Sequence, residues 1–424
     1  MDRMKLLCKQ IKEKISNSWG PTGWFAVGLL GGFVLLFCAM CIYNFNLWKQ
    51  LFFFSIDPYD SFMDFFNPIY WSSSLSTVYQ NSLSIYPPLI TLLAGLTSKL
   101  FPADVFGVGR VGYSLRDLWG AQLLLSFFLT VTISLFAYQL FLTKTGSKKE
   151  RILFCLCILF SLPFLYWIER ANVILLAVMS SLFFVFYYDS SKKYLRHLAL
   201  LMLALAVCIK IYPAALGMLL LKGKRYKEIA LLGLYVLIGF SVPLYWLGGL
   251  DQILLIPQNI KTYLPAGVAF QGFSVQAIIN ACTLIVEKNI NRSLIVWTSG
   301  LSYVIFSVGV FSSYFIQTKW KVVALLCLLM ILLPVISGTY TLLLMIIPLV
   351  LFLNDYHPSL FNRIYLLLFI IIFSFKIPFR FSFAIGNVLG ADLVTGFALL
   401  TMFAMLCAEA FILLKKKWTM LRKR

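Results

Sequence analysis

The sequence predicts an all-α polytopic membrane protein, and two observations carry that prediction: its composition and the spacing of its apolar runs. Hydrophobic residues fill 61% of the 424 positions and charged residues only 12%, whereas a soluble domain carries about 25% charged residues. Apolar runs of about 20 residues, the length that spans a bilayer core, recur along the chain. We therefore expect a single integral membrane domain over residues 1–424, a bundle of about twelve transmembrane crossings that includes short half-spans.

The first apolar run, residues 24–43, follows a basic segment and is not followed by a small-residue cleavage site, so we expect it to be a retained span. When the runs are threaded from an inner N-terminus, most Lys and Arg fall on the inner side and account for the net charge of +20. This positive-inside pattern sets the orientation and requires no nucleic-acid partner. The predicted location is the cell membrane, with both termini cytoplasmic and membrane lipids as surroundings.

This threading leaves two long segments on the outer side, residues 44–117 and 248–292. The run 198–221 begins and ends at basic inner loops, and at 1.5 Å per residue it is too short for two full crossings. We expect a shallow hairpin or a pair of half-spans, with the helix broken at Pro213. The same hairpin places Lys210 within the membrane, where a cation needs a partner.

Cysteine and histidine indicate neither a disulfide framework nor a metal site. Most of the nine cysteines lie in apolar runs, and Cys282 alone falls in an outer loop. The two histidines, His197 and His357, both lie near inner loops, so no His and Cys ligand set is expected. The sequence therefore predicts no metal and no cofactor.

The polar stretch 57–89 holds three of the sixteen acids within eight positions, Asp57, Asp60 and Asp64. A carboxylate cluster beside a membrane is costly unless it has a function. On a short helix Asp60 and Asp64 share a face, and their mutual repulsion is expected to raise the pKa of one of them toward a value useful for proton transfer. The alternative is that they are solvated loop acids. Neighbouring aromatic residues favour a place at the membrane–water boundary: Phe62, Phe65, Phe66, Tyr70 and Trp71.

A second polar group, residues 169–172, lies in a tight outer turn between two predicted spans. In one interpretation, Glu169 and Arg170 only form an ion pair with each other. In the other, Arg170 or Asn172 faces the same outer cavity as Asp64 and hydrogen-bonds a sugar or a phosphate. Lys210 likewise has two interpretations. It is either a residue of a half-helix whose charge has a partner within the protein, or a cation that binds a phosphate.

Five cations near the outer face suit an anionic lipid headgroup, although such cations are often solvated or snorkelling. They are Arg170, Lys210, Lys261, Lys376 and Arg380.

Three motifs, taken in order, resemble a known family. The first reads Asp64-Phe65-Phe66-Asn67-Pro68-Ile69-Tyr70-Trp71, followed by Tyr79 and by Tyr86-Pro87-Pro88-Leu89. The second is Glu169-Arg170-Ala171-Asn172, and the third is Cys208-Ile209-Lys210-Ile211-Tyr212-Pro213, which an apolar run and basic residues follow. Over residues 57–227 this order resembles the polyprenyl-phosphate-mannose-dependent mannosyltransferases, the family 87 branch of the GT-C membrane glycosyltransferases. The chain departs from that pattern in having Glu169 before Arg170 and the additional acids Asp57 and Asp60.

The resemblance implies a GT-C-like bundle whose outer loops form the active-site cavity. It implies transfer of a hexose, mannose by the family name, from a polyprenyl-phosphate donor to a glycan or glycolipid acceptor of the cell envelope. Asp64 is then the general base of an inverting reaction, with Asp60 as its coupled neighbour. The residues expected to hold the phosphate or the sugar are Arg170, Asn172, Lys210, Tyr212, Tyr70, Tyr86, Lys376 and Arg380, together with the ring of Trp71.

Two other functions fit the same features. A flippase or transporter of lipid-linked sugars also has many spans, but its charged residues are expected along a two-sided pathway and often in related halves. No internal repeat is visible. A polysaccharide polymerase is expected to depend on outer-loop arginines more than on an aspartate of the first loop.

Overall fold

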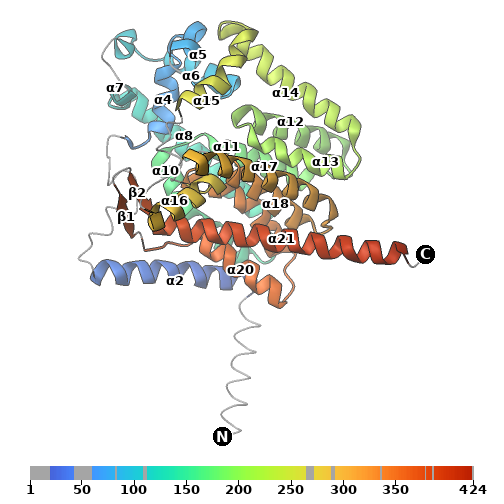
Figure 1. Ribbon diagram of the computed structural model, residues 1–424. Helices are drawn as coiled ribbons and strands as arrows, with labels where there is room; N and C mark the ends of the chain where they lie inside the picture. Colours follow the sequence, from blue (N-terminus) through green and yellow to red (C-terminus); the bar gives the residue numbers. More distant parts are fainter. Residues whose placement is uncertain are drawn as a thin grey trace.

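The computed structural model describes residues 20–42, 60–81, 84–107, 112–263, 272–287, 292–334, 337–377, 379–383 and 386–422. These residues are predominantly helical, which confirms the predicted all-α class (Figure 1). Among them, four helices are long and apolar enough to cross a membrane: α2 (Pro21–Ile42), α8 (Trp119–Thr143), α14 (Tyr226–Trp246) and α21 (Gly390–Arg422).

A fifth candidate span is broken into two helices. Helices α9 (Lys148–Leu159) and α10 (Leu162–Arg170) are bent by 54° relative to each other. Pro163 lies in the first turn of α10, and it has no N–H group with which to continue the hydrogen bonds of α9. Ser161 has extended backbone, so the chain turns there between α9 and α10. Because of this bend, α10 ends beside α4 (Met63–Trp71), a helix of the segment 44–117.

Shorter helices complete the bundle: α11 (Ile174–Tyr187), α12 (Lys193–Ile209), α13 (Met218–Lys222), α17 (Arg292–Phe315), α18 (Lys319–Leu332), α19 (Ile346–Asn354) and α20 (Leu360–Phe373), with the 3-10 turns η5 (Tyr212–Gly217) and η7 (Thr339–Met345). As the sequence predicts, the chain breaks within residues 198–221. Helix α12 ends at Ile209, Lys210 has extended backbone, and η5 begins two residues later.

The two long segments between spans contain helices of their own. Residues 44–117 hold α4 (Met63–Trp71), η3 (Leu75–Thr77), α5 (Val78–Asn81), α6 (Pro88–Ser98), η4 (Ala103–Phe106) and α7 (Gly112–Arg116). Residues 248–292 hold η6 (Leu250–Leu254), α15 (Leu255–Tyr263) and α16 (Val275–Glu287).

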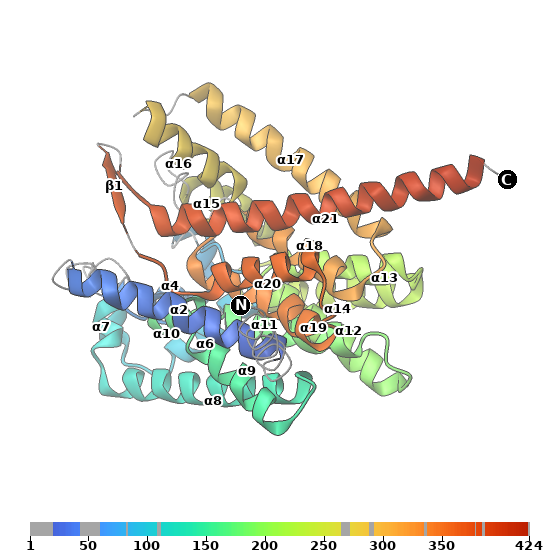
Figure 2. The ribbon, with the colours of Figure 1, turned by 90° about the horizontal axis from the view of Figure 1, so that it is seen from below.

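The last turn before α21 forms a β-hairpin of β1 (Arg380–Phe383) and β2 (Gly386–Leu389). Its strands pair antiparallel, with Arg380 opposite Leu389. The hairpin and α7 lie toward one end of the bundle, whereas the C-terminus lies at the other (Figures 1 and 2).

Helix α18 forms the centre of the bundle. Its residues from Val322 to Leu332 are all buried, as expected for a helix that is apolar on every side. It packs against α17, α19, α21, η5 and η7, and it lies in the middle of the view from below (Figure 2). The bundle is therefore built around an apolar core.

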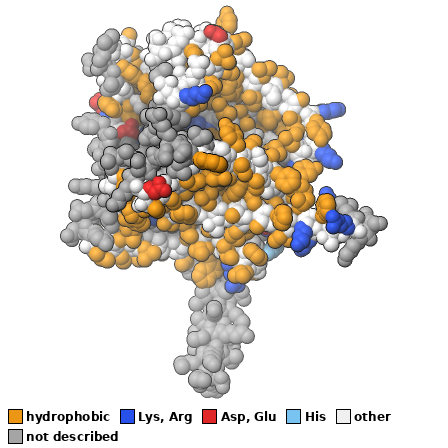
Figure 3. Space-filling model, in the orientation of Figure 1, with side chains coloured by type: hydrophobic (Ala, Val, Ile, Leu, Met, Phe, Trp, Pro, Cys, Tyr) orange, Lys and Arg blue, Asp and Glu red, His pale blue; other side chains and the backbone are white. Residues whose placement is uncertain are grey.

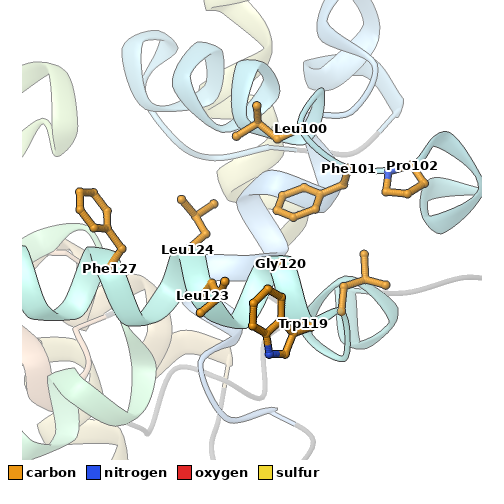
Figure 4. Close-up of a pocket in the computed structure, with 9 residues that line it drawn as sticks. Leu100, Phe101, Pro102, Trp119, Gly120, Leu123, Leu124 and Phe127 are labelled. Carbon is orange, nitrogen blue, oxygen red and sulfur yellow. The ribbon is translucent and has the colours of Figure 1, made fainter.

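The surface around this core is largely apolar (Figure 3). Exposed large hydrophobic side chains lie along the candidate spans, including Leu35, Phe127, Leu237 and Phe411. An apolar recess of about 610 Å³ lies between residues 100–102 and the first turns of α8 (Figure 4). Exposed apolar area of this extent marks a surface that contacts lipid or a partner, which agrees with a membrane protein.

One buried asparagine joins the two long segments. Asn259 of α15 is 4% exposed, and its Nδ2 atom donates to the backbone oxygen of Tyr79 at 2.9 Å and to that of Ser84 at 3.0 Å. Tyr79 in turn donates from its hydroxyl to the oxygen of Tyr86 at 2.9 Å. Asn259 therefore fixes the backbone that leads into the Tyr-Pro-Pro step.

Replacing Asn259 by alanine is expected to lower the melting temperature of the purified protein. Two buried carbonyl oxygens lose their donor, and each such loss costs about 1–3 kcal/mol. The exposed neighbour Gln258 provides the matched control, Gln258→Ala. Equal melting temperatures for Asn259→Ala and Gln258→Ala, measured by thermal unfolding in detergent, would contradict the anchoring role.

Candidate functional site

The candidate site is built where the start of α4 meets the end of α10. Phe62, which precedes α4, has φ of 63°, and Ala171, which follows α10, has φ of 52°. These left-handed residues turn the chain sharply at both helix ends. The backbone nitrogen of Phe62 donates to the oxygen of Glu169 at 2.8 Å. The two turns are therefore joined directly, although they are more than a hundred residues apart in sequence.

Arg170 lies between the two acids of the first segment. Its Nη1 atom pairs with Asp60 Oδ2, and its Nη2 atom pairs with Asp64 Oδ1. Asn172 Nδ2 donates to the other oxygen of Asp64 at 2.9 Å, and Asn172 Oδ1 accepts from the nitrogen of Ile174 at 2.9 Å. Both oxygens of Asp64 are thus held by side chains that are themselves fixed.

This arrangement changes one expectation and supports another. The sequence led us to expect repulsion between Asp60 and Asp64, but the guanidinium of Arg170 lies between them and opposes it. The predicted proximity of Arg170 and Asn172 to Asp64 is confirmed. Asp64 is the more enclosed acid, with 15% of its side chain exposed against 29% for Asp60. Asp57 lies outside the described residues.

Lys210 adds a cation next to this cluster. Its Nζ atom lies 4.6 Å from the centre of the Tyr86 ring, a cation–π contact. Ile209, which precedes Lys210, packs in the same apolar group as Tyr86 and as Val173, which follows Asn172. This packing brings Lys210 near the cluster of Asp64, Arg170 and Asn172. Among the described residues, no carboxylate lies within ion-pair distance of Lys210. Its charge is therefore balanced at longer range than that of Arg170.

Tyr212 extends the site toward the apolar interior. It lines a cavity of about 410 Å³ between η5, α17 and α18, whose other walls are almost wholly aliphatic and aromatic. Ile211, the residue that follows Lys210, also lines this cavity.

Two tyrosines that the sequence did not single out belong to the same cluster. The rings of Tyr166 and Tyr340 have centres 6.2 Å apart, and the charge of Asp64 acts on both hydroxyls. Tyr340 is also close enough to Tyr86 and Tyr212 to interact with them electrostatically. Tyr166 could have been found from its position, because it lies four residues before Arg170 and so on the same helix face.

Lys376 and Asp392 form a further charged pair near Tyr166. Lys376 Nζ donates to the oxygen of Ser374 at 3.0 Å, and burial lowers the pKa of Lys376 to about 8, which the Asp392 carboxylate partly opposes. Asp392, in the first turn of α21, also acts electrostatically on Tyr166. The sequence predicted Lys376 but missed Asp392, which stands at the start of a long apolar run.

The remaining predicted residues have other surroundings. The ring of Tyr70 packs against Phe106 of η4, with ring centres 5.8 Å apart. Arg380 pairs through its backbone in β1, and its side chain lies outside the described part of the structure. Trp71 packs against the apolar group around Tyr86. The roles predicted for these residues in binding remain predictions.

The site can therefore hold a proton acceptor, an anion and a polyol close together. Asp64 is an oriented carboxylate, Lys210 a partly compensated cation, and the tyrosines supply rings and hydroxyl groups. In the described ranges, no three His, Cys, Asp or Glu side chains are grouped so that they could hold a metal ion.

No protein-family model matches the chain, and comparisons with curated proteins and with solved structures gave no match. The resemblance to the family 87 mannosyltransferases therefore stays a prediction that rests on the three sequence motifs.

Removing the guanidinium of Arg170 is expected to destabilise the protein. In Arg170→Gln the carboxylates of Asp60 and Asp64 lose their shared cation, which costs on the order of 3 kcal/mol for a largely buried ion pair. The melting temperature should fall, and a second change, Asp60→Asn, should recover part of the loss. Arg363→Gln, at an exposed position of α20, is the matched control. A variant Arg170→Gln as stable as this control would show that the bridge does not hold α4 to α10.

Proposed function

We propose that the protein is a membrane glycosyltransferase that moves a hexosyl group from a polyprenyl-phosphate donor to a hydroxyl of a glycan or glycolipid acceptor. The observation that carries this proposal is the carboxylate of Asp64, held by Arg170 and Asn172 near the half-buried cation Lys210. An oriented base beside an anion-binding group matches what glycosyl transfer from a phosphate donor requires.

Asp64 supplies the base in the proposed reaction. A carboxylate offers about four lone-pair sites, and Arg170 and Asn172 use two of them. The remaining sites accept the proton of the acceptor hydroxyl as its oxygen attacks the anomeric carbon. The bond from that carbon to the phosphate oxygen breaks, polyprenyl phosphate leaves, and the anomeric configuration inverts.

Lys210 and Tyr212 suit the two parts of the donor. The leaving phosphate gains negative charge, and Lys210 is a cation without a carboxylate at ion-pair distance among the described residues. The apolar cavity that begins at Tyr212 suits an isoprenoid chain. In this arrangement Arg170 positions Asp64, and Tyr86 holds Lys210 in place through its ring.

The proposal includes a GT-C-like bundle of about twelve crossings, with both termini cytoplasmic and the site facing outward. Helix α21 supports this orientation, because it carries Asp392 at one end and the basic residues 415–417 near the other. In Figure 3 most of the visible acids lie toward the end that holds α7 and β1, and most of the visible Lys and Arg toward the C-terminal end. This charge asymmetry is what the positive-inside rule describes.

The arrangement favours an enzyme over a flippase. A translocation pathway needs polar groups that continue from one side of the bundle to the other. Here the polar residues of the site gather beside α4 and α10, whereas α18 presents only apolar buried residues from Val322 to Leu332. The described core therefore offers no continuous polar route of the kind that a transporter needs.

The test is a transfer assay with purified protein, polyprenyl-phosphate mannose and a panel of alkyl glycoside acceptors. Asp64→Asn should lower kcat by about 10²-fold or more, because the proton acceptor is lost while the shape is kept. Asp60→Asn should retain most activity, since Asp60 binds Arg170 from the more exposed side.

The matched control is Asp104→Asn, at an exposed acid of η4 in the same segment. It should transfer sugar at the rate of the unaltered protein. Full activity in Asp64→Asn would refute its role as the base, and movement of the lipid-linked sugar across vesicles without transfer would refute the enzyme.

A further inference from the structure

Helices α17 and α21 pack against each other, and an apolar hollow of about 540 Å³ lies between them. Its walls come from residues 307–315 of α17 and residues 407–414 of α21. In Figures 1 and 2 the C-terminal end of α21 extends beyond the rest of the bundle. None of the residues proposed for the reaction lines this hollow, so it is a separate feature of the molecule.

Small side chains and close packing form the floor of the hollow. Ala410 and Ser312 are buried, and a side-chain hydrogen bond joins Ser312 to Cys407. The rims are two exposed rings, Phe311 on α17 and Phe411 on α21, which are 57% and 67% exposed. Because the hydroxyl group of the floor already has a partner, the hollow suits an apolar occupant.

The length of the hollow matches one leaflet of a membrane. From Ser307 to Phe315 the axis of α17 advances by about 12 Å, at about 1.5 Å per residue. The hydrocarbon core of a bilayer is about 30 Å thick, so each leaflet contributes about 15 Å. An acyl chain of a single leaflet therefore fits the hollow, whereas a membrane-spanning partner helix requires a contact face of about 20 residues.

The face of α21 that lines the hollow continues into basic residues. Lys417 follows Leu414 by three residues and Ala410 by seven, so it lies on the same face of the helix. Trp418 is next on this face, and the guanidinium of Arg422 lies 4.4 Å from the centre of its ring. Tryptophan is enriched at membrane–water interfaces, so Trp418 indicates the level of the lipid headgroups. A phosphate at the end of the hollow would therefore meet Lys417 and Arg422.

The charges of these two cations are not balanced nearby. Lys321 Nζ lies 2.7 Å from each carboxylate oxygen of Glu409, so this acid is already paired. No acid follows Glu409 in the sequence. Within the described ranges, no carboxylate lies at ion-pair distance from Lys417 or Arg422. The end of the hollow is therefore positively charged, which favours an anionic headgroup.

We propose that the hollow between α17 and α21 binds one anionic glycerophospholipid, with an acyl chain along Phe311 and Phe411 and the phosphate between Lys417 and Arg422. In the orientation proposed above, this lipid belongs to the cytoplasmic leaflet. The site is independent of glycosyl transfer, because none of its residues takes part in the proposed reaction. The bound lipid fills the space between the two helices and so stabilises their pairing.

The test is native mass spectrometry of the purified full-length protein, titrated with phosphatidylglycerol and separately with phosphatidylcholine. The unaltered protein should bind one phosphatidylglycerol at least fivefold more tightly than phosphatidylcholine. Lys417→Gln should weaken the binding of phosphatidylglycerol about fivefold, because one basic residue near a membrane surface contributes about 1 kcal/mol to the attraction of anionic lipids. Ser307→Trp should weaken the binding of both lipids, because the indole ring would occupy the hollow.

The matched control for charge is Lys416→Gln. Lys416 is an exposed cation of the same run, but it lies two residues after Leu414 and so faces away from the hollow. This variant should bind phosphatidylglycerol within twofold of the unaltered protein. Thr401→Trp, at an exposed position of α21 outside the hollow, controls for the added ring and should leave the binding of both lipids unchanged.

Three results would overturn the proposal. Equal losses in Lys417→Gln and Lys416→Gln would indicate a general attraction between the basic end of α21 and anionic lipids. Polyprenyl phosphate that binds more tightly than phosphatidylglycerol and is weakened by Lys417→Gln would assign the hollow to another lipid. A dimer that binds no phosphatidylglycerol would assign it to a second copy of the chain.

Discussion

The bridge from Arg170 to Asp60 and Asp64 is the interaction on which the rest of the site depends. It joins the start of α4 to the end of α10, and the hydrogen bond from Phe62 to Glu169 joins the same two turns through the backbone. Three largely buried charges are stable together only because the cation lies between the anions. The same bridge, together with Asn172, fixes both oxygens of Asp64, so stability and the proposed chemistry depend on one arrangement.

The sequence predicted much of the fold because membrane spans leave a strong local signal. The long apolar runs became α2, α8, α14 and α21, and the break near Lys210 followed from the length of its run and from Pro213. Other features depend on tertiary contacts. The bend between α9 and α10, the helix α16 inside an expected loop and the β-hairpin before α21 leave no distinct pattern of hydropathy in the sequence. The count of about twelve crossings stays a prediction.

The site was predictable where its residues lie in short polar motifs. Asp64, Arg170, Asn172 and Lys210 stand out because each is a polar residue beside an apolar run, and the structure brings all four together. Tyr166 was missed although it lies four residues before Arg170. Tyr340 and Asp392 were missed because the fold alone brings them near Tyr166. The sequence likewise could not show that a guanidinium separates Asp60 from Asp64.

The central claim is that Asp64 is the base and that Lys210 holds the donor phosphate beside it. It is tested most directly by a cryo-electron microscopy structure of the unaltered protein with a non-hydrolysable phosphonate analogue of the donor. The account predicts a phosphonate oxygen within about 3 Å of Lys210 Nζ, the isoprenoid chain in the cavity at Tyr212, and the anomeric carbon facing Asp64. A phosphonate bound at Lys376, or a sugar remote from Asp64, would contradict it.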